Sequence, residues 1–282
     1  MFATDPENPW ITAVRHAPRR APAALVGAIG LVVPGALLFA SRASASVVPD
    51  VFSDSLLFGV LALAAFIGTR LEGRRLSPRE TYGAAGVIAG LALGLGAVFA
   101  CAAVATIAGA NGMILGPPRL PVGPLLAAIL VAALGAVAQE VFFRGWIQPL
   151  LCASWGVWSG LVATAAAFLA FHVAAGVHGL VGGLNVLLAG LLLGLLALRS
   201  GGLAASVATH LIWVWTAFGG LGFSPQGLIG QVQLSGPALW SGGDQGLGGS
   251  LATTAVLLVL VASILTVKPR AVPGAGEPRT QL

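Results

Sequence analysis

Long apolar stretches that lack charged residues alternate with shorter polar segments along most of the chain. A membrane-spanning helix needs about 20 predominantly apolar residues, and eight stretches of the sequence approach this length. They lie at 23–39, 55–69, 82–108, 122–143, 155–177, 180–198, 203–221 and 250–267. Because a chain inside the bilayer must satisfy its backbone hydrogen bonds internally, the pattern predicts an all-α, polytopic membrane protein with about eight transmembrane helices.

The composition supports this fold class. Of the 282 residues, 57% are hydrophobic and 8% are charged, whereas a soluble domain carries about 25% charged residues. A cytosolic enzyme and a disordered chain are therefore excluded. The net charge of +5 does not indicate a nucleic-acid partner, because the basic residues lie between apolar stretches. Cys101 and Cys152 lie in or beside apolar stretches without metal-ligand spacing, and we expect them to be packing residues.

The basic residues fall mainly on one side of the eight-helix arrangement. Arg42 and Arg119 fall on the second side. The other twelve fall on the first side, and they are Arg15, Arg19, Arg20, Arg70, Arg74, Arg75, Arg79, Arg144, Arg199, Lys268, Arg270 and Arg279. Since cytoplasmic loops carry an excess of Lys and Arg, we expect both termini to be cytoplasmic. The preference for Arg over Lys favours a bacterial plasma membrane.

The first apolar stretch ends in Ala43-Ser44-Ala45, a small-residue pattern that resembles a signal-peptidase site. Its length and its long polar leader favour a retained first span over a cleaved signal. The expected division is a cytoplasmic segment at 1–22, N-terminal helices at 23–121, a core that carries the candidate chemistry at 122–221, a loop and last helix at 222–267, and a cytoplasmic tail at 268–282.

Glycines recur every four residues in two of the expected helices. Gly86, Gly90 and Gly94 follow this spacing in the third, and Gly190 and Gly194 follow it in the sixth. Small residues at this spacing allow neighbouring helix backbones to approach closely. We therefore expect close helix packing within the chain at these positions.

A few polar residues interrupt the apolar stretches. Glu140 and Arg144 lie at the end of the fourth stretch, with Gln139 beside them, while His172 lies in the fifth and His210 in the seventh. An ionisable group inside a span costs about 2.5 to 3.5 kcal/mol on insertion scales and is a functional candidate. Glu140 and Arg144 are four residues apart, a spacing that allows an ion pair on one helix face. These residues together predict an intramembrane polar site.

One carboxylate and two imidazoles are compatible with several kinds of chemistry. They can form a general-base site in which Glu140 activates water and His172 and His210 stabilise an oxyanion. They also match a zinc site with two His ligands and one Glu ligand, although the chain has no HExxH motif. A transporter with a proton relay would also explain the buried ionisable groups.

Three short motifs resemble those of the CPBP intramembrane proteases, the family that includes the type II CAAX prenyl endopeptidases and the bacterial Abi proteins. The segment from Gln139 to Arg144 resembles the first motif, Glu-Glu-x-x-x-Arg, and Phe168 to His172 resembles the second, Phe-x-x-x-His. His210, which follows the small-residue segment after Gly194, resembles the third. The resemblance covers about 122–218, with motif order and spacing intact.

The resemblance implies a role for each matching residue. Gln139 stands where the family has the Glu that activates the attacking water, and Glu140 stands at the second Glu. Arg144 is the motif Arg, His172 and His210 are the motif histidines, and Phe168 is a packing residue beneath the site. Family members have been described both as metalloproteases and as metal-free glutamate proteases. The resemblance therefore implies either no cofactor or one divalent metal such as zinc, with Glu140, His172 and His210 as its ligands.

Two positions depart from the family pattern. Gln139 is an amide that cannot act as a general base, and Val214 stands where the third motif usually has Asn or Asp. General-base help is worth about 10² to 10⁴ in rate. Glu140 is then the expected base, with His172 and His210 holding the oxyanion or a metal.

The predicted function is that of an intramembrane endopeptidase which hydrolyses a peptide bond in a membrane-associated protein or peptide. Its expected partners are this substrate and the lipid bilayer, with no nucleic acid. The alternative, motivated by the two departures, is a catalytically impaired relative that serves as a membrane binding, scaffold or immunity protein.

Overall fold

The structure, a computed structural model, describes residues 51–71, 83–110, 121–216 and 234–266. The expected first span at 23–39, the Ala43-Ser44-Ala45 pattern and the tail at 268–282 lie outside these residues. The regular elements of the described part are helices, with no strand among them. The prediction of an all-α fold is therefore confirmed.

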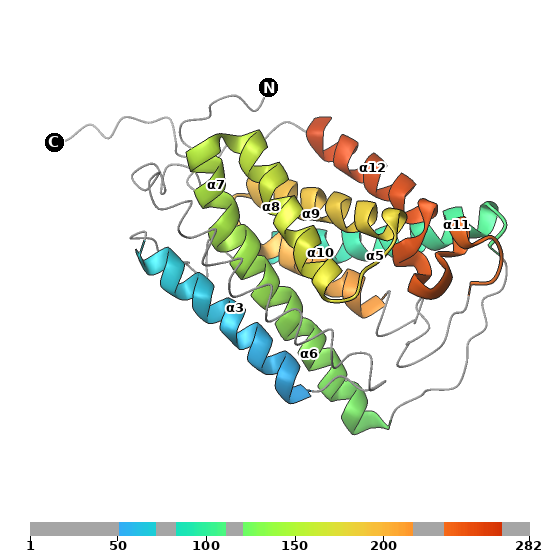
Figure 1. The fold of residues 1–282 in the computed structure, drawn as a ribbon, viewed down its shortest axis with the longest axis horizontal. Coiled ribbons are helices and arrows are strands. Elements are labelled where there is room, and N and C mark those ends of the chain that lie inside the picture. The colour runs from blue at the N-terminus through green and yellow to red at the C-terminus, as the bar shows by residue number, and fades with distance from the viewer. Residues whose placement is uncertain (1–50, 72–82, 111–120, 217–233, 267–282) are drawn as a thin grey trace.

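The helices follow one another in the order that Figure 1 labels. They are α3 (Val51–Leu71), α5 (Ala84–Ile107), α6 (Val122–Glu140), the π-helix η1 (Val141–Ile147), α7 (Gln148–Trp155), α8 (Val157–Ala174), α9 (Leu180–Ser200), α10 (Ala204–Val214), α11 (Ala238–Ser241), the 3₁₀-helix η3 (Gly243–Gly249) and α12 (Leu251–Thr266).

Five helical segments of the described chain are long and apolar enough to cross a membrane. They are Ala84–Ile107, Ile129–Trp155, Val157–Ala174, Leu180–Ser200 and Gly243–Thr266. Two shorter apolar helices, Ser55–Leu71 and Ala204–Val214, occupy the positions of the second and seventh expected spans. The chain is thus a polytopic integral membrane protein.

The fourth span differs from its expected boundary. The helix does not end at Phe143 but continues through η1 and α7 to Trp155, and only Gly156, at φ +89°, separates α7 from α8. Arg144 is consequently 1% exposed inside the protein and not in a cytoplasmic loop. The expected span ends before Arg144 because a charged residue interrupts the apolar sequence. In the structure Glu140 neutralises Arg144, so the helix continues past it inside the protein. Arg144 therefore does not count toward the expected charge asymmetry, which becomes eleven to two.

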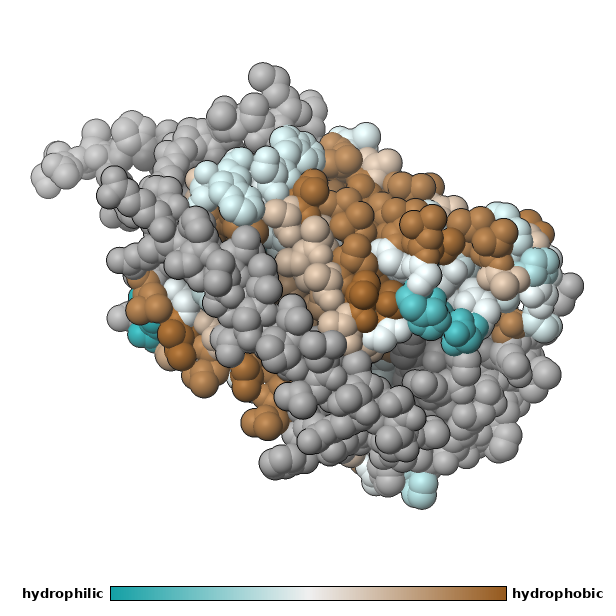
Figure 2. All heavy atoms as spheres, viewed as in Figure 1, coloured by the Kyte–Doolittle hydropathy of each residue, from teal (hydrophilic) through white to brown (hydrophobic). Residues whose placement is uncertain are grey.

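Where the face in Figure 2 is formed by described residues, hydrophobic side chains cover much of it. Ile88, Leu130, Leu180 and Val259 are each more than 60% exposed, which is typical of helices that face lipid. Inside, η1 packs between α3 and α8, and a cluster that includes Phe142, Phe143, Ile147, Phe168 and Phe171 fills this space. This cluster fixes the η1 backbone beside the polar residues of the fourth and fifth spans.

Two glycine series lie at helix contacts, as expected. A Cβ at Gly90 would come 2.4 Å from the Ala205 carbonyl oxygen, and one at Gly94 would come 2.7 Å from that of Thr209, so α5 and α10 are in backbone contact. On α9, a Cβ at Gly190 would come 3.1 Å from Ala165 Cα of α8. Close packing within the chain is confirmed for these positions.

Candidate active site

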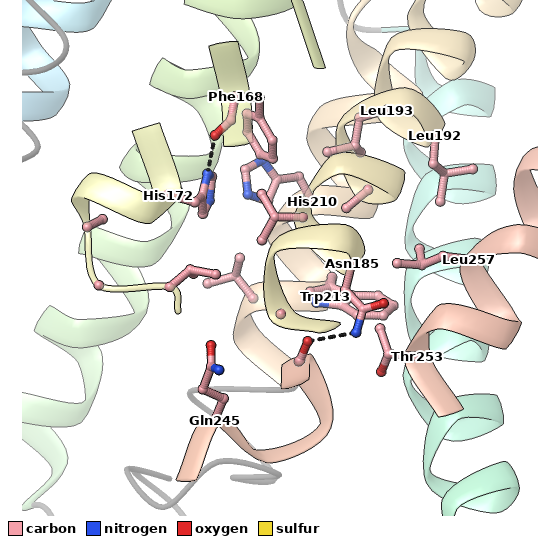
Figure 3. A pocket seen from close by; sticks show the side chains of 18 of the residues that line it. Phe168, His172, Asn185, Leu192, Leu193, His210, Trp213, Gln245, Thr253 and Leu257 are labelled. Atoms are coloured by element: carbon pink, nitrogen blue, oxygen red, sulfur yellow. Dashed lines mark hydrogen bonds between the residues drawn. The ribbon is translucent and has the colours of Figure 1, made fainter. Parts of the chain in front are cut away.

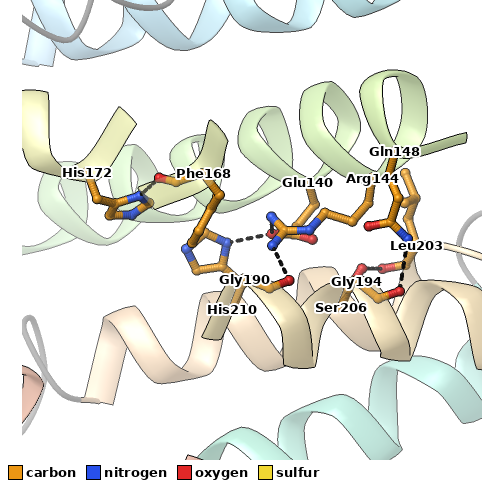
Figure 4. Close-up of polar contacts among 10 residues, drawn as sticks. All are labelled: Glu140, Arg144, Gln148, Phe168, His172, Gly190, Gly194, Leu203, Ser206 and His210. Atoms are coloured by element: carbon orange, nitrogen blue, oxygen red, sulfur yellow. Dashed lines mark hydrogen bonds and ion pairs between the residues drawn. The ribbon is translucent and has the colours of Figure 1, made fainter. Parts of the chain in front are cut away.

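Glu140 and Arg144 form an ion pair at the junction between α6 and η1. Arg144 Nη1 donates a hydrogen bond to Glu140 Oε1 over 2.9 Å, and both side chains have an exposed fraction of 0%. Since both charges are out of water, each lowers the cost of burying the other. The pair that the spacing of four residues predicts is present (Figure 4).

The guanidinium of Arg144 is also held from two other directions. Arg144 Nη2 donates to the Gly190 carbonyl of α9 over 3.0 Å. Its Cζ lies 4.3 Å from the centre of the Phe168 ring, a cation–π contact with α8. Phe168 therefore supports the site by stacking, in agreement with the packing role that the family resemblance implies.

A π-helical turn places these side chains. Val141 to Ile147 follow a π-helical path that begins directly after Glu140, and π-turns within α-helices occur frequently at functional sites. One turn further on, Gln148 Nε2 donates to the Gly194 carbonyl over 3.0 Å. Arg144 and Gln148 thus bind two glycine carbonyls that are also four residues apart, and this pairing fixes α9 beside η1.

His210 joins the ion pair from α10. Its Nδ1 and Glu140 Oε1 are 2.9 Å apart, and its side chain is nearly buried. Because the carboxylate accepts, Nδ1 donates the hydrogen, and Nε2 is the ring nitrogen that this bond leaves unused. The structure therefore brings Glu140, Arg144 and His210 together from three segments of the chain.

His172 lies beside them but makes a different contact. Its Nδ1 donates to the Phe168 carbonyl over 2.9 Å, and its ring centre is 4.2 Å from that of Phe168. The Phe168 ring is in turn 5.7 Å from the ring of His210. Both imidazoles therefore flank one phenyl ring, each with Nδ1 bonded and Nε2 left for another partner.

Both histidines line a cavity of about 390 Å³. Its walls are largely apolar, with side chains such as Leu192, Leu193 and Trp213, and Figure 3 shows the two imidazoles at one end of it. Glu140, Arg144 and Gln139 are not among the residues that line this cavity. Glu140 is connected to the cavity through its hydrogen bond with His210, which is one of the lining residues.

Gln139 and Val214 mark the two departures from the family pattern. Gln139 is 8% exposed, and its Oε1 is buried without a hydrogen-bond partner in the described structure. Val214 lines the cavity as part of its apolar wall. The structure therefore places Val214 at the site and keeps Gln139 outside the cavity.

Asn185 is a cavity residue that the sequence did not single out as functional. Its Nδ2 donates to the carbonyls of Gly248 and Ser250, each over 2.9 Å, and its Oδ1 accepts from Thr254 over 2.6 Å. These bonds tie α9 to the start of α12 and use the whole amide. A lone Asn in an apolar helix is the only sequence signal for this role, because its partners lie 63 to 69 residues away.

The arrangement does not fit the zinc site that the sequence allowed. Within the described residues, no three His, Cys, Asp or Glu side chains are grouped so that they can hold a metal ion. Glu140 Oε1 already accepts from Arg144 and His210, and a guanidinium at this distance would repel a divalent cation. Glu140, His172 and His210 are thus not arranged as a ligand set.

A protein-family model matches part of the chain. The family model described as "Type II CAAX prenyl endopeptidase Rce1-like" matches residues 121–216. The matched segment runs from the start of α6 to just beyond α10, so it contains all three motifs and the polar contacts described above. No curated protein and no solved structure matches the chain.

Proposed function

On the premise that residues 121–216 belong to the CPBP family of intramembrane proteases, we propose that the chain is a peptide-bond hydrolase. Its substrate is a membrane-associated protein or peptide, and the reaction takes place in the cavity that His172 and His210 line. The observation that carries the proposal is the bond from His210 Nδ1 to the buried carboxylate of Glu140. It holds the imidazole in one tautomer, with the lone pair of Nε2 free to accept a proton.

In the proposed reaction, His210 is the general base. A water molecule in the cavity attacks the carbonyl carbon of the scissile bond while His210 Nε2 takes one of its protons. The imidazolium that forms is stabilised by Glu140, in the way that a buried carboxylate stabilises the histidine of a catalytic triad. The same proton then passes to the departing nitrogen as the carbon–nitrogen bond breaks, and an acid and an amine are formed.

The other polar residues act around this step. Glu140 orients His210, and Arg144 orients Glu140, so both are positioning residues in this proposal. His172 Nε2 can accept a hydrogen bond from the second O–H of the attacking water. Gln139 cannot act as a general acid or base. Because His210 is the base in this proposal, an amide at position 139 is compatible with activity. The expectation that Glu140 is itself the base remains a prediction, and the variants below distinguish the two roles.

The test is cleavage of membrane-anchored peptides by the purified protein in lipid bilayers. The peptide panel contains prenylated and unmodified members, and the variants are His210→Gln, His172→Gln, Glu140→Gln and Gln139→Glu. We expect His210→Gln to lower kcat by about 10² to 10⁴, the usual contribution of a general base. Ser263→Ala serves as the control, because its hydroxyl is exposed and bonds only within α12.

The pattern of losses separates the hypotheses. If Glu140 acts through His210, Glu140→Gln lowers kcat without exceeding the loss in His210→Gln, and the double variant is no worse than His210→Gln alone. Cleavage that survives both substitutions would overturn the assignment. Cleavage that begins only in Gln139→Glu would favour the catalytically impaired relative.

A further inference from the structure

The cavity has a closed polar end and an exposed end. His172 and His210 lie at the first, and Gln245 lies at the second (Figure 3). His178 and Asp244 also line the cavity, and their side chains are 62% and 78% exposed. The cavity therefore opens between His178 in the α8–α9 turn and η3, and we call this opening the mouth.

Hydrogen bonds hold the two sides of the mouth together. Gln245 Nε2 donates to the His178 carbonyl over 2.6 Å, and the His178 backbone N–H donates to Gln245 Oε1 over 3.3 Å. The His178 ring lies 3.1 Å from Asp244 Oδ2. These contacts place the mouth where α8 ends, α9 begins and α12 begins.

The basic residues lie at the opposite ends of these helices. Gly190 and Gly194 of α9 contact Arg144 and Gln148 in the same order along the chain, so α9 runs in the direction of η1 and α7. α3 runs the same way, because Phe58 lies against Gly135 of α6 and Gly68 lies against Trp146 of η1, so the contacts follow the same order in both segments. Arg70 and Arg199, in the last turns of α3 and α9, are consequently at the side away from the mouth.

The sequence beyond the helices adds to this asymmetry. α3 and α12 both end on the side away from the mouth. The sequence that directly follows α3 contains Arg74, Arg75 and Arg79, and the sequence that follows α12 contains Lys268 and Arg270. Among the described residues that line the mouth, the ionisable ones are His178 and Asp244. By the positive-inside rule, the basic side faces the cytoplasm.

We propose that the cavity opens on the non-cytoplasmic side of the membrane and takes its substrate from there. That the occupant is a substrate rests on the proposed function, whereas the direction of the opening does not. A cavity of about 390 Å³ is at the small end of ligand pockets, which span about 300 to 1,000 Å³. With its apolar walls, it fits a short, extended, apolar segment at the non-cytoplasmic end of a membrane-anchored chain, and not a folded domain.

Single cysteines test the direction of the opening. Cys101 and Cys152 are buried, so the native background of thiol labelling is low. Asp244→Cys places a thiol at the mouth, and Ser200→Cys places a matched, exposed thiol at the opposite end of α9. With a membrane-impermeant maleimide, we expect Asp244→Cys to react in intact cells and Ser200→Cys to react only after permeabilisation.

The reverse labelling pattern, or labelling of Ser200→Cys in intact cells, would overturn the proposal. A second measurement tests the route of the substrate. A bulky maleimide on Asp244→Cys should lower hydrolysis of a membrane peptide at least tenfold, whereas the same adduct on Ser200→Cys should leave it unchanged. Equal rates for the two adducts would exclude the mouth as the route. If the labelling is as expected but no peptide is cleaved by any variant, the proposed hydrolysis fails and the direction of the opening stands.

Discussion

Arg144 carries a charge that is buried inside the protein and stabilised by three contacts. Its two terminal nitrogens bind the Glu140 carboxylate and the Gly190 carbonyl, and its face stacks on Phe168. The planar guanidinium makes all three contacts at once, whereas a lysine ammonium is a point charge without a stacking face. Arginine is therefore required here for its shape as well as for its charge.

Arg144→Lys should keep the ion pair but lose the bond to Gly190. A hydrogen bond to a charged group contributes about 1.5 to 3 kcal/mol, and we expect a loss of this size in the free energy of unfolding, measured with denaturant in detergent micelles. Arg70→Lys is the control, because Arg70 is exposed and its contact among the described residues is stacking on Phe66. Equal stability of the two variants would contradict the anchoring role of Arg144.

At the scale of helices, the contact between α5 and α10 positions His210. Gly90→Ala would put a Cβ 2.4 Å from the Ala205 carbonyl oxygen, so the two backbones must separate. Overpacking of this kind costs about 1 to 3 kcal/mol, and thermal unfolding should begin at a lower temperature. Gly96→Ala in the same helix is the matched control, because its Cβ would have no heavy atom within 4 Å. The helix preference of alanine should make that variant neutral or slightly more stable, and a similar loss in both would refute the packing argument.

The mouth should respond to pH through His178. The hydrogen bond to the Gly176 carbonyl, and then the Asp244 carboxylate, hold the pKa of His178 above its ordinary value of about 6.5. The protonated His178 ring therefore stabilises the folded state fully at a pH below the ordinary pKa of about 6.5. This stabilisation is lost as the pH rises through the raised pKa of the folded protein. An NMR titration should give a midpoint above 6.5 in the unmodified protein. In Asp244→Asn it should fall part of the way back, since the Gly176 bond remains, and an unchanged midpoint would rule out Asp244 as a partner.

At the scale of the whole molecule, the family segment depends on helices outside it. α10 packs most extensively against α5, and α9 packs against α12, yet α5 and α12 lie outside residues 121–216. A fragment of residues 121–216 alone should therefore be degraded by an added protease at a concentration that leaves the full chain intact. Co-expression with 1–120 and 234–282 should restore resistance. A fragment that resists protease by itself would show that the outer helices are dispensable.

The sequence predicts the helical architecture because the length and apolarity of a span are local properties. It also points to Glu140, Arg144 and His210, because ionisable residues are rare in apolar stretches. It does not predict that the fourth span continues past Arg144, since this requires the neutralising contacts of Glu140 and Gly190. The π-helical path of η1 and the bonds of Asn185 are likewise set by packing against distant helices, and one sequence window does not contain them.

The buried ion pair also has a consequence for the biogenesis of the protein. Glu140 and Arg144 emerge from the ribosome together and can neutralise each other as soon as their helical turn forms. The Gly190 carbonyl follows 46 residues after Arg144, and His210 follows 70 residues after Glu140. At about 5 to 20 residues per second, Arg144 awaits Gly190 for about 2 to 9 s, and the fourth helix must enter the bilayer during this interval. Loss of the Glu140 charge should therefore reduce the amount of protein inserted before it affects any reaction, and variants at this position need to be compared at equal quantities of inserted protein.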